Sequence, residues 1–275
     1  MRRVLLSWTT LAGGTLLVAL AGGLAFAGPV LGAAEVGDAV EVRSVATYLA
    51  RSIETGETVG RFLQVRARVR MAEETRAQLH LARDVPRVLS ARLQADGGWI
   101  LPCGAGGILP SPLAMLSQSA PEGGEPISPL FYLPAGTAPG ALELVVGIDR
   151  GGGPIEPVAR SPLSSAEGLE SLANAVRIGR VGEKIEERPD FESLGGTREM
   201  KTVRLQLPAG FTRILSRGTA ELYRGEELAE DLSLELASDV VAARFPPEAE
   251  LGTGPWELHF PALGVKLLLD VTGGD

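Results

Sequence analysis

The sequence is poor in the side chains that metal binding and nucleophilic catalysis use most. Its 275 residues include one cysteine, Cys103, and two histidines, His80 and His259. A single cysteine cannot form a disulfide within the chain, and a zinc site needs three or four closely spaced His, Cys or carboxylate ligands. Both histidines lie on the polar faces of predicted strands, where we expect solvated side chains. The sequence therefore predicts no metal site and no cofactor.

Catalytic motifs are lacking as well. The chain contains neither a Gly-x-Ser-x-Gly nor a Ser-x-x-Lys motif, and no lysine follows the glycine-rich stretch 104–107 as it would in a phosphate-binding loop. Cys103 would need a nearby base, such as His80, to form a thiolate, and a buried, unreactive thiol is the more ordinary state. We predict no catalytic residue and a protein that is not an enzyme.

Positive charge and aromatic residues are also scarce. The chain has 26 Lys and Arg against 34 Asp and Glu, a formal net charge of −8. Nucleic-acid binding needs clustered positive charge across a domain, so this balance argues against it. Aromatic residues make up 5% of the chain, which leaves few surfaces for stacking sugars. We expect Trp99, Tyr132 and Trp256 in the core or at an interface.

The N-terminus has the pattern of a secretory segment. Arg2 and Arg3 precede an uncharged, apolar stretch, 4–34, and Ala25-Phe26-Ala27 fits a small-x-small cleavage site. Residues 1–27 are therefore expected to be a signal peptide, or an uncleaved membrane anchor, because the stretch is long enough to span a bilayer. In both cases we expect an extracytoplasmic protein, in the periplasm or at the cell surface. It would contact the membrane only through this segment.

Alternating apolar and polar residues predict strands in the rest of the chain. In residues 62–71, four apolar residues alternate with Gln64 and three arginines, the pattern of a half-buried strand. Residues 75–81 and 88–95 repeat it. Asp96-Gly97-Gly98 then separates 88–95 from an apolar run, 99–101, which predicts a hairpin because glycine adopts positive φ without steric cost.

These elements predict an all-β fold with two sandwich-like, immunoglobulin-like modules. The first, 35–150, carries a long loop rich in proline and glycine, 102–141. A connector, 151–200, is expected to hold one short helix at about 165–178. The second module, 201–272, is expected to contain many short, closely spaced strands.

The expected helix and strands rest on specific residues. Ser164 and Glu167 fit a capping box, and apolar residues follow it at helical spacing. Within the loop, 130–133 is expected to be a short strand, and 142–148 an apolar strand after it. The strands of the second module are expected around 203–207, 214–215, 219–223, 232–236, 240–245, 256–260 and 265–271.

One surface stands out as a candidate binding face. Arg66, Arg68 and Arg70 lie on one side of a single predicted strand, and Arg76 follows in the next. Guanidinium groups in such a row can hold carboxylate, phosphate or an acidic partner through paired hydrogen bonds. A charged strand face that prevents aggregation would have the same pattern.

These inferences predict a binding or scaffold protein of the cell envelope. It would act through protein–protein contacts made by the loop 102–141 or by the arginine face, and another envelope protein is the expected partner. Two alternatives stay open. One is a hydrolase acting on an envelope polymer, since aspartates distant in sequence can converge in a fold. The other is a small-ligand carrier whose loop covers a pocket.

Overall fold

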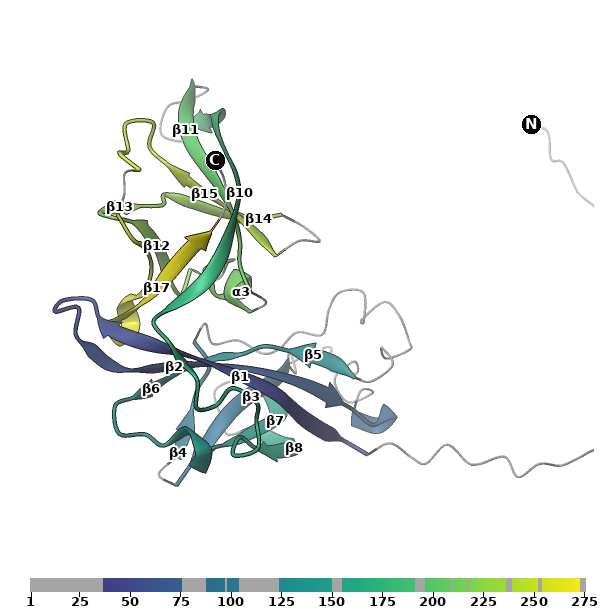
Figure 1. Cartoon of the computed structure of the whole chain (residues 1–275). Coiled ribbons are helices and arrows are strands. Elements are labelled where there is room, and N and C mark those ends of the chain that lie inside the picture. Colours follow the sequence, from purple (N-terminus) through teal and green to yellow (C-terminus); the bar gives the residue numbers. More distant parts are fainter. Residues whose placement is uncertain are drawn as a thin grey trace, which may run out of the picture. The chain divides into compact units, whose positions relative to one another are not determined.

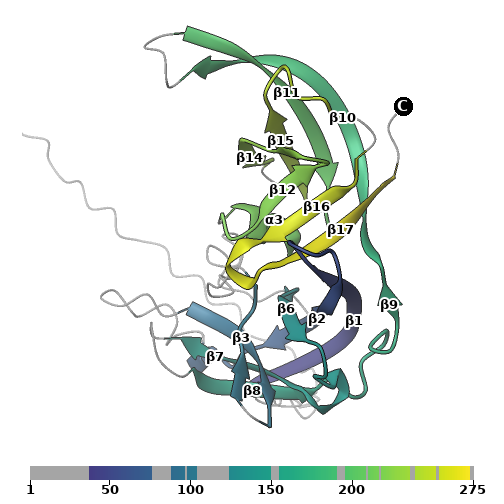
Figure 2. The same cartoon turned by 90° about the vertical axis from the view of Figure 1, so that its left-hand side faces the viewer.

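The computed structural model describes residues 37–75, 88–96, 98–103, 124–149, 155–190, 196–208, 210–216, 218–235, 239–251 and 254–272. These residues form mostly strands, in one sheet of thirteen strands and one of four, so the predicted all-β class is confirmed (Figures 1 and 2). We use "N-terminal region" for β1 to β9 and "C-terminal region" for β10 to β17.

The N-terminal region is built around one long hairpin. β1 (Ala39–Ser52) and β2 (Thr58–Arg70) pair antiparallel along almost their whole length. β5 (Glu125–Ile127) and β6 (Leu130–Pro134) pair with the other edge of β2. β9 (Leu172–Ala173) pairs parallel with β1.

A second, four-stranded sheet packs on the same core. Its order is β4 (Gly98–Ile100), β3 (Val88–Ala95), β7 (Glu143–Asp149) and β8 (Glu156–Pro162). Buried side chains from both sheets form one cluster, with Leu63 and Val65 of β2 packed among Leu89, Leu93 and Leu144. The predicted hairpin is confirmed, because Ala95 of β3 lies opposite Gly98 of β4.

The C-terminal region is the other part of the thirteen-stranded sheet, joined to the N-terminal hairpin where β1 pairs with β17, and it curls back on itself. Its strands are β10 (Ala175–Asp190), β11 (Gly196–Gln206), β12 (Glu221–Arg224), β13 (Glu227–Leu228), β14 (Asp231–Leu234), β15 (Val240–Phe245), β16 (Trp256–Phe260) and β17 (Val265–Thr272). Along the sheet their order is β13-β12-β16-β17-β10-β11-β15-β14. The two end strands, β13 and β14, are separated by only two residues of chain, so the two edges must lie close together.

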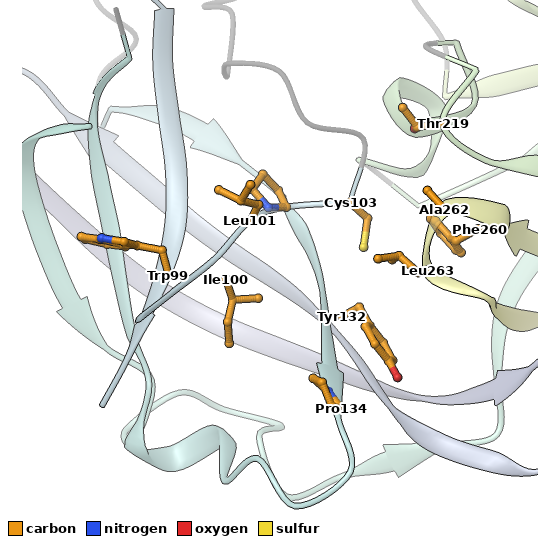
Figure 3. A pocket seen from close by; sticks show the side chains of 11 residues that line it. Trp99, Ile100, Leu101, Cys103, Tyr132, Pro134, Thr219, Phe260, Ala262 and Leu263 are labelled. Atoms are coloured by element: carbon orange, nitrogen blue, oxygen red, sulfur yellow. The ribbon is translucent and has the colours of Figure 1, made fainter. Parts of the chain in front are cut away.

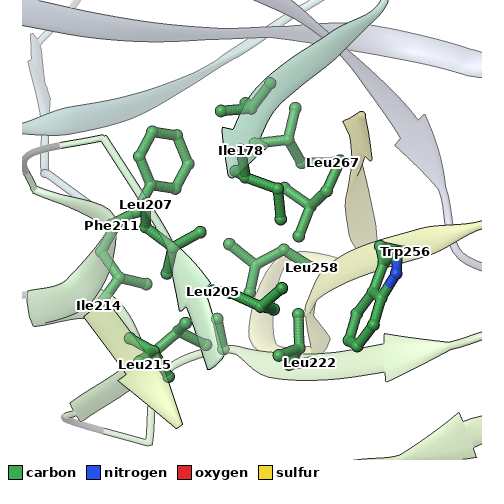
Figure 4. Packing of buried hydrophobic residues seen from close by; sticks show 14 of the residues in the cluster. Ile178, Leu205, Leu207, Phe211, Ile214, Leu215, Leu222, Trp256, Leu258 and Leu267 are labelled. Atoms are coloured by element: carbon green, nitrogen blue, oxygen red, sulfur yellow. The ribbon is translucent and has the colours of Figure 1, made fainter. Parts of the chain in front are cut away.

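The inner face of this curled sheet encloses a second core (Figure 4). Leu205 of β11 and Leu207, just after that strand, belong to one buried cluster with Leu222, Leu258 and Leu267 from strands across the curl. The short helix α3 (Phe211–Ser216) adds three apolar side chains, Phe211, Ile214 and Leu215. Three residues of the N-terminal region, Ala50, Phe62 and Leu130, belong to the same cluster.

Several predicted strands are confirmed with the expected bounds or close to them. The predicted ranges 88–95, 240–245 and 256–260 coincide with β3, β15 and β16. Within the predicted range 62–71 the alternation is confirmed from Val65 to Arg70, since Val65, Ala67 and Val69 are buried while Arg66 and Arg70 are exposed. Residues 104–123 of the loop and 76–81 of the predicted second strand lie outside the described residues, and Glu73–Thr75 is helical rather than extended.

The helix predicted at about 165–178 is wrong. The segment contains a turn, then β9, then the start of β10, which pairs parallel with β17 from Ala175 to Gly179. Gly168 has φ of 82°, a left-handed conformation that interrupts an α-helix, and Leu172 is half exposed. Long-range hydrogen bonds explain the error: Val45 N donates to Glu167 O at 2.8 Å, and Thr47 donates to Leu169 O at 3.3 Å.

Two further expectations need correction. The range 151–200 is not a plain connector, because it contains β8, β10 and the start of β11. Residues 214–215, predicted as a strand, lie in α3. Ile214 and Leu215 are both buried in the C-terminal core, and adjacent residues of a strand would point to opposite faces. Finally, sequence patterning missed β1, the longest strand of the N-terminal region.

Candidate binding cleft and arginine row

An apolar cleft with a volume of about 610 Å³ lies among the described residues (Figure 3). Residues from β4 and the segment just after it form one wall, and β6 contributes Tyr132 and Pro134. Phe260, at the end of β16, and the following turn η2 (Pro261–Leu263) form the opposite wall. The full lining is Trp99, Ile100, Leu101, Pro102, Cys103, Tyr132, Pro134, Thr219, Phe260, Ala262 and Leu263.

Backbone pairing holds the first wall in place. Pro102 forms an isolated bridge with Phe131, and Cys103 N donates to Leu130 O at 2.7 Å. These contacts tie the segment after β4 to β6. Trp99 and Ile100 at the end of the four-stranded sheet, and Leu101 just after it, therefore line the cleft.

The second wall depends on a tight turn and on the packing of a buried aromatic side chain. Gly264 ends η2 with φ of 66°, a conformation that favours glycine, and its N–H donates to Pro261 O at 3.1 Å. Beneath the cleft, the fully buried Phe62 packs with its ring centroid 5.0 Å from that of Phe260 and 5.6 Å from that of Tyr132. Phe62 thus joins both walls.

The polar groups of the cleft are engaged within the protein. The Tyr132 hydroxyl donates to Val59 O at 3.3 Å, and the Thr219 hydroxyl donates to Ile214 O at 3.0 Å. Burial raises the pKa of the Cys103 thiol to about 12, so the thiol is protonated and poorly nucleophilic at neutral pH. The described lining contains no charged side chain. This arrangement suits the binding of apolar groups.

The rim of the cleft exposes large apolar side chains. Trp99 is 40% exposed, Leu101 54% and Leu263 45%. Clustered exposed apolar residues mark interaction surfaces, and tryptophan is among the residues that contribute most to binding energy at protein interfaces. Trp256, by contrast, is a core residue at 5% exposed and stacks under the Arg224 guanidinium.

Three of the four predicted binding arginines share one face of β2. We call Arg66, Arg68 and Arg70 the arginine row; Arg76 lies outside the described residues. Arg66 and Arg70 are exposed and Arg68 is half-buried. Among the described residues no ion pair to any of the three is found. Gln64, predicted on this face, is instead fully buried and donates to Ser128 Oγ at 3.1 Å.

The prediction of a solvated His259 needs correction, while His80 lies outside the described residues. The His259 side chain is only 13% exposed and stacks on Tyr223, with the ring centroids 4.2 Å apart. Its Nε2 lies 2.7 Å from Glu257 Oε2, and Lys266 Nζ donates to both oxygens of Glu257 at 3.0 Å. Burial alone would raise the pKa of Glu257, but hydrogen bonds from His259 and Lys266 lower it. The cluster is internally satisfied, so we assign it a structural role.

A second ionic network lies on the outside of β10, β11 and β15. Arg244, almost fully buried, donates to Glu186 Oε1 at 3.0 Å and to Asp231 Oδ2 at 2.5 Å. Lys184 Nζ lies 2.8 Å from Glu186 Oε2, and Thr202 donates to Oε1 at 2.9 Å. These donors hold the pKa of Glu186 well below its usual range.

In the part of the chain that the structure describes, no three His, Cys, Asp or Glu residues are placed to hold a metal ion. The helices within the described ranges are all too short or too polar to cross a membrane.

Comparison with known proteins brings no match among family models, curated proteins or solved structures.

Sequence reasoning missed the cleft, although part of its signal is visible. The run Trp99-Ile100-Leu101 is apolar on successive residues, which is unusual for a strand with one solvated face. The other wall, 260–263, lies far along the chain, and no local pattern predicts that the two segments meet.

Proposed function

We propose that this chain is an extracytoplasmic, non-enzymatic binding protein that holds apolar side chains of a partner protein in the cleft. The observation that carries the proposal is the open, uncharged cleft rimmed by Trp99, Leu101 and Leu263, each at least 40% exposed. An exposed apolar rim around a hollow fits an interface, where partner side chains insert into desolvated pockets.

Two observations support a role in binding over catalysis. The described lining has no carboxylate and no histidine, and burial raises the pKa of both its titratable groups, Tyr132 and the Cys103 thiol, the latter to about 12. The carboxylate and histidine cluster around Glu257 is satisfied by its own neighbours. General acid–base chemistry needs a group that can reach substrate with a pKa near the working pH.

The proposal also covers the location of the protein and the type of its two regions. Location outside the cytoplasm, with an envelope protein as partner, is supported by Arg2, Arg3 and the uncharged stretch 4–34. We also propose that the two regions are sandwich-like modules of immunoglobulin-like kind. The shared core of the two N-terminal sheets and the curled C-terminal sheet are the support for this.

A small-ligand carrier is the second candidate, and the cleft volume favours it. About 610 Å³ lies within the range of ligand pockets, about 300–1,000 Å³, and the lining is mainly hydrophobic and aromatic. The same cleft would then hold a neutral apolar molecule instead of partner side chains.

Photo-crosslinking in cells distinguishes these candidates. A photoreactive phenylalanine analogue replaces Leu101 at the cleft rim or, as a matched control, Leu172 in β9, which is 50% exposed and does not line the cleft. We expect a discrete protein adduct at position 101 and none at position 172. A small-molecule adduct at 101 would instead support the carrier.

The proposal also predicts the effect of a charge in the cleft. Leu101→Asp should abolish the adduct formed from a photoreactive group at position 263, while Leu172→Asp should leave it unchanged. Equal labelling from cleft and control positions would show that the cleft is not a binding site.

A further inference from the structure

The arginine row is a second surface with a regular chemical pattern, and it takes no part in the cleft. Its three members occupy alternate positions of β2, so successive side chains leave the same face about 7 Å apart. Opposite them on β1 are Ser44, Glu41 and Ala39, in register with Arg66, Arg68 and Arg70. On the other side of the strand, Pro126 of β5 faces Arg68.

Carboxylates do not neutralise this face among the described residues. Glu41, directly across from Arg68, makes its ion pair with Arg43 at 3.8 Å. Arginines elsewhere in the same region do have carboxylate partners: Arg92 pairs with Asp149 at 3.1 Å and Arg160 with Glu143 at 3.2 Å. In a chain with a formal net charge of −8, a run of three arginines on one face is therefore a local excess of positive charge.

Protection of a sheet edge does not explain the row. Charged side chains commonly prevent edge strands from pairing with other molecules. β2, however, is an interior strand, with β1 on one side and β5 and β6 on the other. Its backbone is already paired where the arginines lie, so no edge needs protection there.

We propose that the arginine row binds an extended acidic segment of a protein partner that carries carboxylates on alternate residues. An extended chain places residues i, i+2 and i+4 on one side with the same spacing of about 7 Å, so three carboxylates can match three guanidinium groups. Each guanidinium can bind its carboxylate through two parallel hydrogen bonds. Affinity comes from charge pairs at an exposed face and falls as salt rises.

The probe is a synthetic peptide with alternating Glu and Thr that presents four glutamates. Its binding to the full chain is measured by fluorescence anisotropy at low ionic strength. The test variant is Arg66→Gln/Arg68→Gln/Arg70→Gln. The control variant, Arg160→Gln/Arg177→Gln/Arg198→Gln, lowers the net charge by the same three units at dispersed positions.

We expect the row variant to lose affinity by about tenfold, the sum of three exposed charge pairs, and the control variant by less than about twofold. A peptide of the same composition with its four glutamates in one block should bind more weakly. Leu101→Asp should bind the alternating peptide as the wild type does, which separates this surface from the cleft.

Three results would overturn the proposal. Equal losses in the two triple variants would mean that only net charge acts. Equal binding of the block and alternating peptides would show that the spacing of the carboxylates along the peptide does not matter. Tighter binding of inorganic polyphosphate than of the alternating peptide would assign the row to phosphate rather than to an acidic protein segment.

Discussion

The N-terminal and C-terminal regions use charge in different ways. On the outside of the C-terminal sheet, carboxylates and cations are joined in networks: Glu186 with Arg244, Glu257 with His259 and Lys266, and Arg204 with Glu235. On β2 of the N-terminal region, three successive outward arginines have no described ion pair. Charges that stabilise a fold are satisfied within it, and the arginine row differs from the C-terminal networks in this respect.

The two regions also build their cores differently. The N-terminal core lies between two sheets, so each sheet contributes one face. The C-terminal core is enclosed by one curled sheet and α3, and residues of the N-terminal hairpin complete it. The second core therefore depends on the first region, and the aromatic contact of Phe62 is the clearest link.

Phe62→Ala should have the largest effect on stability. Phe62 is fully buried against Phe260 and Tyr132, so its loss leaves a cavity in the core that both regions share. We expect a loss of about 3–5 kcal/mol in the free energy of unfolding, measured in urea. The control Trp99→Ala, at a 40% exposed residue, should cost less than about 1 kcal/mol. A small effect at Phe62 would show that the C-terminal core does not need the N-terminal hairpin.

Glu257→Gln should have the next largest effect. The change leaves Lys266 and His259 without their carboxylate in a poorly exposed site, at a cost of about 2 kcal/mol. Glu226→Gln, at an exposed turn, should change stability by less than about 0.5 kcal/mol. If both variants unfold at the same urea concentration, the cluster of Glu257, His259 and Lys266 does not stabilise the fold.

Acid should weaken the C-terminal region through Glu186. Its pKa in the folded protein lies below that in the unfolded chain, about 4.3, so the unfolded state binds the proton more readily. The stabilisation is therefore present above about pH 4 and is lost as the pH falls toward the lowered folded value. Glu186→Gln should make the melting temperature less dependent on pH between about 5 and 3. Glu187→Gln, one residue away, should keep the wild-type slope; identical slopes in all three proteins would contradict the assignment.

Neutralising the arginine row should have the smallest effect on stability. Because the three side chains have no described ion pair, Arg66→Gln/Arg68→Gln/Arg70→Gln should shift the free energy of unfolding by no more than about 0.5 kcal/mol. Urea unfolding of the variant and the wild type measures this. A loss of several kcal/mol would mean that the row stabilises the fold, and the contrast between the two regions would fail.

The error at 165–178 shows where local reasoning stops. Ser164, Glu167 and the spaced apolar residues form a legitimate helix pattern, and only tertiary contacts with β1 and β17 override it. Helix propensity is worth a few tenths of a kcal/mol per residue, so strand pairing and burial of Val176 outweigh it. In 88–95 and 240–245, by contrast, the local pattern and the long-range pairing agree, and the predicted bounds match β3 and β15.

The sequence by itself determined the all-β class and the outward face of β2 from Arg66 to Arg70, because a period of two is a property of each strand alone. Only the tertiary structure decided that Trp99 and Leu263 line one cleft, that Glu257 and His259 are enclosed, and that the C-terminal sheet curls until β13 and β14 lie close together. These features depend on contacts between residues far apart in the chain. Such contacts are set by the packing of whole sheets and leave no periodic signal in the local sequence.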